Sequence, residues 1–179
     1  MTEEYEPRLF ADNAAVRGIG EGLIARTLTR PHWTHEAHLA ACLYIVAERP
    51  DIAPERDLPD IIRRFNESVG GVNSDTEGYH ETITQVYIRG VRAFLARTDP
   101  ALPLIEKVNA LLLAEEGRRD WPLCFYYPKT LFSREARLGW VEPDMGALPE
   151  LPASAGERTA DRFGRSAGRT ARREGPSSA

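Results

Sequence analysis

The sequence predicts an all-α protein: a compact bundle of about five helices with a disordered C-terminal tail. Apolar residues recur every three or four positions in several separate stretches, which is the period of an amphipathic helix. No stretch alternates apolar and polar residues as a half-buried strand does. We therefore expect one helical domain over residues 1–150 and a disordered tail over residues 151–179, where Ala, Gly, Ser, Arg and Pro follow one another without periodicity.

The first predicted helix spans about residues 11–27. Val16, Ile19 and Leu23 form one stripe along it, which we expect to face the core. Glycines within this helix lower its intrinsic stability but allow a neighbouring helix to approach closely. They are Gly18, Gly20 and Gly22.

The second predicted helix spans about residues 35–47, between Pro31 and Pro50. Thr34 precedes it and is a suitable N-cap, because its hydroxyl can accept a hydrogen bond from a backbone amide of the first turn. The first residue of this helix is therefore His35.

The remaining predicted elements follow in order along the chain. A proline-containing connector over residues 49–59 leads to a third helix that ends at Gly70. The fourth and longest helix spans about residues 77–96, and a fifth spans about residues 102–116. Beyond it the chain becomes aromatic and irregular, and the sequence that follows Ser133 resembles the start of a short helix.

Composition excludes several classes of protein. The formal net charge of −4 argues against a nucleic-acid-binding core, which needs a concentrated basic surface. No apolar stretch is long enough to cross a membrane, and the acidic N-terminus is unlike a secretory signal. Cys42 and Cys124 each have apolar neighbours, so we expect two buried free thiols in a reducing compartment. These observations predict a cytoplasmic protein without membrane or nucleic-acid partners.

All four histidines fall in two short segments, residues 32–38 and 78–82. His35 and His38 are one turn apart on the second predicted helix and should both face the interior. His80 shares the apolar stripe of the fourth predicted helix, so it should face inward as well. The two segments are therefore expected to converge.

Three neutral imidazoles beside a carboxylate suit a divalent metal ion, most often zinc or iron. We predict that His35, His38 and His80 are the metal ligands. Glu81 is the predicted catalytic residue, as a general base, unless it is a ligand or a partner of one. The spacing differs from the His-Glu-x-x-His pattern of zinc proteases, since only two residues separate the first pair. The alternative is that all three histidines are structural and bond to backbone, Tyr or Glu groups.

Two of these segments also carry a resemblance. The runs Thr34-His35-Glu36-Ala37-His38-Leu39 and Gly78-Tyr79-His80-Glu81-Thr82 resemble the signatures of an uncharacterised family of short bacterial helical proteins. The stretch from Leu131 to Asp144 is similar to that family too. The resemblance supports the histidine sites and implies no particular reaction.

The leading hypothesis is a metal-dependent enzyme that acts on a small molecule, either by activating water or by oxygen chemistry. It would be a hydrolase, a lyase or an oxygenase. The second hypothesis is a non-catalytic helical protein that binds a metal or another ligand. The third is an interaction module whose histidines are structural.

Overall fold

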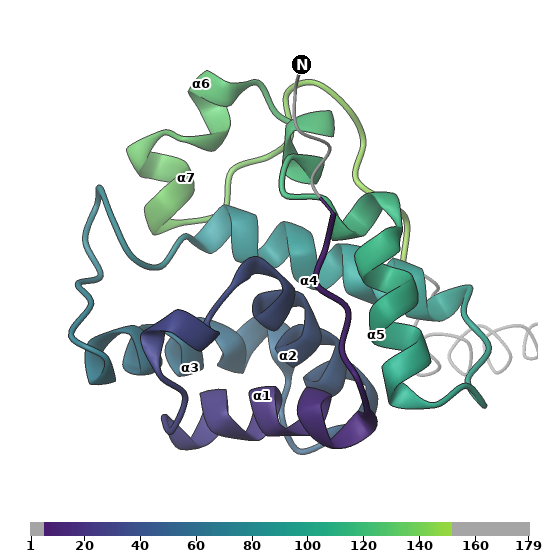
Figure 1. Ribbon diagram of the computed structural model, residues 1–179. Helices are drawn as coiled ribbons and strands as arrows, with labels where there is room; N and C mark the ends of the chain where they lie inside the picture. The colour runs from purple at the N-terminus through teal and green to yellow at the C-terminus, as the bar shows by residue number, and fades with distance from the viewer. Residues whose placement is uncertain (1–5, 152–179) are drawn as a thin grey trace, which may run out of the picture.

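The computed structural model describes residues 6–151, and within this range it contains helices and no strands (Figure 1). The all-α prediction is confirmed. The predicted tail lies outside the described residues, apart from its first position. The five longest helices are α1 (Asn13–Ala25), α2 (His35–Glu48), α3 (Pro54–Ser68), α4 (Glu81–Ala96) and α5 (Leu104–Leu113).

Shorter helical segments connect and follow these five. They are η1 (Arg30–His32), η2 (Glu115–Gly117), η3 (Trp121–Cys124), α6 (Pro128–Leu131) and α7 (Arg134–Leu138). The predicted short helix after Ser133 is confirmed as α7, because the Ser133 hydroxyl accepts a hydrogen bond of 3.1 Å from the amide of Ala136. The predicted fifth helix ends earlier than expected, since its last turn forms the separate 3₁₀ segment η2.

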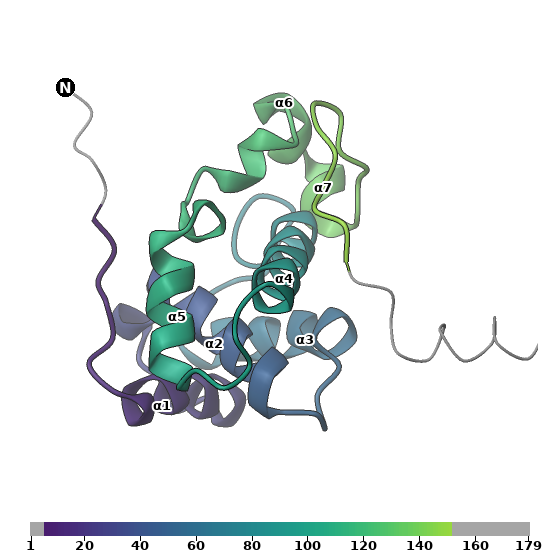
Figure 2. The same ribbon diagram turned by 90° about the vertical axis from the view of Figure 1, so that its right-hand side faces the viewer.

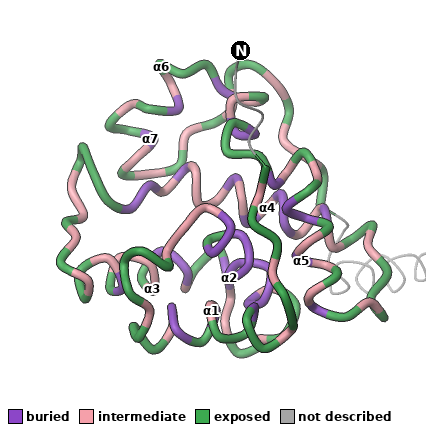
Figure 3. The backbone as a smooth tube through the Cα atoms, viewed as in Figure 1, coloured by how far each residue is buried: buried purple, intermediate pink, exposed green. Residues whose placement is uncertain are grey.

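The central helix is α2, which contacts α1, α3, α4 and α5. Figure 3 shows that most of it is buried. A helix that is apolar on all sides belongs in the middle of a bundle, whereas an amphipathic one lies at its edge. Thr34 caps α2 as predicted, accepting a hydrogen bond of 3.3 Å from the amide of Ala37.

Gly20 allows α1 to pack closely against α2. A Cβ atom at this position would lie 2.1 Å from a ring carbon of Tyr44, which is on α2. The Tyr44 ring is buried and its hydroxyl donates a hydrogen bond to Glu21, so it is held at both ends. The predicted close helix contact is thus confirmed at Gly20, while a Cβ at Gly18 would meet nothing within 4 Å.

The third helix begins earlier than predicted, at Pro54, and contains Pro59 in its interior. Proline lacks the amide that would bond to the carbonyl four residues earlier. That carbonyl belongs to Glu55, and it accepts a hydrogen bond of 2.8 Å from the side chain of Gln85 on α4. A partner from a neighbouring helix therefore replaces the missing donor.

In Figure 1, α4 runs across the middle of the molecule, and in Figure 2 it is seen nearly end-on. Helices α1 to α3 lie on one side of it, over the larger hydrophobic core, and α6 and α7 lie on the other. Val86 of α4 packs there with Trp121, Tyr126 and Leu131 in a smaller second core. No helix within residues 6–151 has both the length and the apolar character needed to cross a bilayer.

The two cysteines differ in exposure. Cys42 is buried on α2, as predicted, but Cys124 is exposed, so that part of the prediction was wrong. Cys124 ends the 3₁₀ segment η3, which buries its first two residues, Trp121 and Pro122. Apolar neighbours in the sequence do not decide burial in such a short turn, because successive side chains point in different directions.

Candidate functional site

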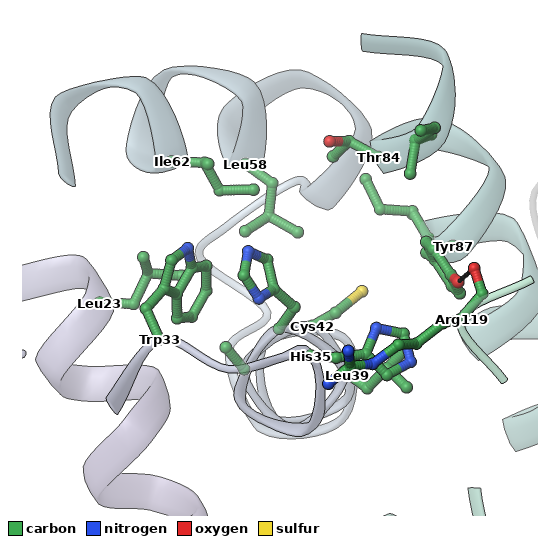
Figure 4. Close-up of a pocket in the computed structure, with 14 residues that line it drawn as sticks. Leu23, Trp33, His35, Leu39, Cys42, Leu58, Ile62, Thr84, Tyr87 and Arg119 are labelled. Atoms are coloured by element: carbon green, nitrogen blue, oxygen red, sulfur yellow. Dashed lines mark hydrogen bonds between the residues drawn. The ribbon is translucent and has the colours of Figure 1, made fainter. Parts of the chain in front are cut away.

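A cavity of about 440 Å³ lies between α2 and α4 and is completed by α1, α3 and the chain after η1. We call it the first cavity. In Figure 4, Leu58 and Ile62 of α3 face α2 across it, with Thr84 and Tyr87 of α4 at one side. Its apolar wall includes Leu23, Leu39, Leu58, Ile62, Ile83 and Ile88. Its polar wall residues are His35, His38, Cys42, Thr84, Tyr87 and Arg119.

His38 bonds to its own helix through one ring nitrogen and lines the first cavity. Its Nδ1 lies 2.6 Å from the carbonyl oxygen of Thr34. A carbonyl can only accept, so Nδ1 carries the proton and Nε2 carries the lone pair. Within residues 6–151, Nε2 has no hydrogen-bond partner. The Trp33 ring stacks against the imidazole, with 3.8 Å between ring centroids.

The surroundings of His38 favour its neutral form. Burial of the ring among protein atoms lowers its pKa to about 4, although the bond to Thr34 opposes this shift. The ring packs against Trp33 but is exposed to solvent where it lines the cavity. The neutral ring therefore predominates at pH 7. His38 therefore presents a lone pair to the cavity at neutral pH.

His35 also lines the first cavity and joins α2 to η2. Its Nε2 donates a hydrogen bond of 2.8 Å to the carbonyl oxygen of Gly117. Burial lowers the pKa of His35, and the positive charge of Arg119 lowers it further. Both histidines line the first cavity, but His35 is half-buried and His38 is exposed, so the prediction that both face the interior is confirmed for His35 only.

His80 does not lie on the stripe of α4, because that helix begins one residue later, at Glu81. His80 is the N-cap: its Nδ1 accepts a hydrogen bond of 3.3 Å from the amide of Ile83. Its Nε2 donates to the carbonyl oxygen of Leu131, 3.0 Å away at the end of α6. Burial and the charge of Arg137 lower its pKa. Nδ1 therefore caps α4, and Nε2 joins the start of α4 to α6.

Glu81, the predicted catalytic residue, lies away from the first cavity. Its carboxylate accepts hydrogen bonds from Tyr79 (3.0 Å), Arg63 (3.3 Å) and Gln85 (2.9 Å). The Arg63 guanidinium also stacks over the Tyr79 ring, 4.2 Å from its centroid. Glu81 borders a different cavity, on the side of α4 that carries Arg89. This network is structural and leaves Glu81 without contact to the histidines of α2.

The predicted ligand set does not form one metal site. His38 and His80 both border a further cavity, but the two nitrogens of His80 already have partners. Among the described residues, no group of three or more His, Cys, Asp or Glu side chains is placed to hold a metal ion. Burial raises the pKa of Cys42 to about 12, so its thiol stays protonated and is a poor ligand. Within residues 6–151, His35, His38, His80 and Glu81 are therefore not gathered into one four-residue metal site.

Several wall residues of the first cavity were not predicted from the sequence. Trp33 sits in the histidine segment, and its place between two histidines was the only local signal for it. Tyr87 and Thr84 come from α4, and Tyr87 donates through its hydroxyl to the carbonyl oxygen of Arg118, 2.8 Å away. These residues meet α2 only through the packing of the bundle, which periodicity does not specify.

Comparisons with known proteins give no relative whose site could be compared with these cavities. The resemblance based on three short motifs stays a prediction. No protein-family model, no curated protein and no solved structure matches this chain.

Proposed function

We propose that the protein binds a small, mainly apolar molecule with a hydroxyl or amide N–H group, which donates a hydrogen bond to Nε2 of His38 in the first cavity. The observation that supports this proposal is the lone pair of His38 Nε2, which is a hydrogen-bond acceptor in a mainly apolar wall. Ligand sites typically combine such a wall with a few polar groups that orient the ligand. A volume of about 440 Å³ is within the usual range for such sites.

The chemistry of His38 supports binding more than proton transfer. A general base works best when its pKa is near the working pH. The pKa of His38 is lowered to about 4, so the ring is a weak base at neutral pH and a steady hydrogen-bond acceptor. We expect the protein to act in the cytoplasm, where the thiols of Cys42 and Cys124 stay reduced.

The test is calorimetric titration with 1-hexanol and with hexyl methyl ether, which has no hydroxyl to donate. In His38→Asn, the amide nitrogen can still donate to the Thr34 carbonyl, but the shorter side chain places no acceptor at the position of Nε2. We expect hexanol to bind this variant about threefold to tenfold more weakly than wild type, because a hydrogen bond contributes about 0.5–1.5 kcal/mol net. The ether should bind both proteins equally.

His32→Asn is the matched control, since His32 is exposed and bonds only to Thr29 within the described residues. Its hexanol affinity should equal that of wild type. The proposal is overturned if hexanol does not bind the wild type. It is also overturned if the alcohol and the ether bind His38→Asn and wild type with the same affinities.

A second candidate function is a metal-dependent hydrolase, lyase or oxygenase using zinc or iron. One observation favours it: two neutral histidines, His35 and His38, line the same cavity. Elemental analysis of the purified protein tests it, with His38→Asn as the comparison. Near-stoichiometric metal that is lost in the variant would support this candidate, and protein free of metal after reconstitution with zinc and ferrous iron would contradict it.

A further inference from the structure

A second cavity, of about 420 Å³, adjoins the first. It lies between η1, the end of α3, residues 69–80 and the start of α4. We call it the second cavity. Residues that line it and not the first cavity include Arg30, Phe65, Asn66, Val72 and Glu77.

A shared layer of side chains separates the two cavities. The residues that line both are Trp33, His38, Ile62, Ile83 and Thr84. The same side chains therefore face both spaces. The stacked rings of Trp33 and His38 are part of this boundary. Nε2 of His38 is therefore placed where a ligand would pass from one cavity to the other.

The two cavities differ in polarity. The wall of the first is mainly apolar, whereas the second contains the guanidinium of Arg30, the carboxylate of Glu77 and the amide of Asn66. Neither Arg30 nor Glu77 forms an ion pair within the described residues. Both side chains are exposed and their formal charges sum to zero, so the polar wall of the second cavity matches a polar group without net charge.

We infer that the two cavities together bind one linear amphiphile with an internal amide. Its apolar chain fills the first cavity, its amide N–H donates to Nε2 of His38 at the boundary, and its uncharged polar head lies in the second cavity. This inference rests on the proposed function of the first cavity. It adds the chemical class of the ligand and a second contact region.

The test compares N-octanoylethanolamine, which has an uncharged polar head, with octanamide, which lacks that head but keeps the amide N–H. Each is titrated into the full-length protein. We expect the ethanolamide to bind wild type about fivefold more tightly, as added hydrogen bonds and buried area would give. N-Octanoylglycine, with a carboxylate head, should bind no more tightly than the ethanolamide.

A pair of variants then assigns the effect to one cavity. Val72 is 57% exposed and lines only the second cavity, so Val72→Phe narrows that space without disturbing the core. Val72→Phe should make N-octanoylethanolamine bind no more tightly than octanamide, and the affinity for octanamide should stay unchanged. Val69→Phe is a second variant that narrows the second cavity. Cys42→Met extends into the first cavity only and should weaken both ligands.

The outcomes separate the two claims. If octanamide binds and the ethanolamide binds no more tightly, the amphiphile inference fails while the proposed function stands. If neither octanamide nor the ethanolamide binds wild type, the proposed function and the amphiphile inference both fail. If the carboxylate ligand binds tenfold more tightly than the ethanolamide, the head is anionic and the inference of an uncharged head is overturned.

Discussion

His38 bonds to the backbone through one ring nitrogen, whereas His80 does so through both. Nε2 of His38 faces a cavity, whereas both nitrogens of His80 have backbone partners. The sequence placed both residues toward the interior, which is correct for the buried His80, whereas His38 is exposed where it lines the cavities. It could not separate their roles, because the partners of His80 depend on where α4 begins and on Leu131, far along the chain.

The role of His80 as an N-cap predicts how two substitutions differ. His80→Ala should lower the free energy of unfolding by about 1–3 kcal/mol, because it removes a cap and a buried hydrogen bond to the Leu131 carbonyl. His80→Asn should recover the cap, since asparagine is a favoured N-cap residue. Urea unfolding measures both. If the two variants were equally destabilised, and EDTA destabilised wild type to the same degree, His80 would be a metal ligand instead.

The lowered pKa of His38 predicts a dependence of stability on pH. The folded state holds the ring neutral down to pH about 4, whereas the unfolded chain takes up the proton near the ordinary value of about 6.5. Stability contributed by His38 is therefore present above pH 6.5 and is lost as the pH falls toward 4. Urea unfolding at pH 7 and pH 5 should show a smaller decrease in His38→Asn than in wild type. An equal decrease in the two proteins would show that the His38 ring is not held neutral.

The sequence predicts helix contacts that arise from regularly spaced residues. It does not predict a contact in which a side chain from another helix bonds to a backbone carbonyl left without its amide partner. The close approach of α1 to α2 follows from the glycines of α1. The position of Pro59 inside α3 could not be predicted, because the compensating donor is Gln85 on another helix. Proline is a strong local signal for a helix boundary, and a tertiary hydrogen bond overrides it here.

The α1–α2 contact predicts opposite effects for two neighbouring glycines. Gly20→Ala should destabilise the protein by about 1–3 kcal/mol, because its Cβ would overlap the Tyr44 ring. Gly18→Ala should stabilise it by about 0.5–1 kcal/mol, since alanine favours helix and the site is open. Thermal unfolding of both variants is the check. A Gly20→Ala protein as stable as Gly18→Ala would mean that α1 and α2 are farther apart.

For the whole molecule, the helical bundle followed from periodicity, and the cavities did not. A cavity depends on how far apart α2, α3 and α4 settle when their side chains pack, and no single stretch of sequence encodes that distance. The histidine cluster still pointed to the right region, since two of its members line the first cavity. His38 and His80 do meet at the second cavity, but both ring nitrogens of His80 already have backbone partners there.

The most direct measurement is the ¹⁵N NMR shift of the His38 Nε2 nucleus during titration with 1-hexanol at pH 7. The resonance is assigned by its loss in His38→Asn. An alcohol that donates to Nε2 should move this resonance toward the value of a protonated nitrogen, while the resonances of His80 stay in place. An unmoved His38 resonance at saturating alcohol, or an equal shift at His80, would contradict the assignment of the first cavity as a ligand site.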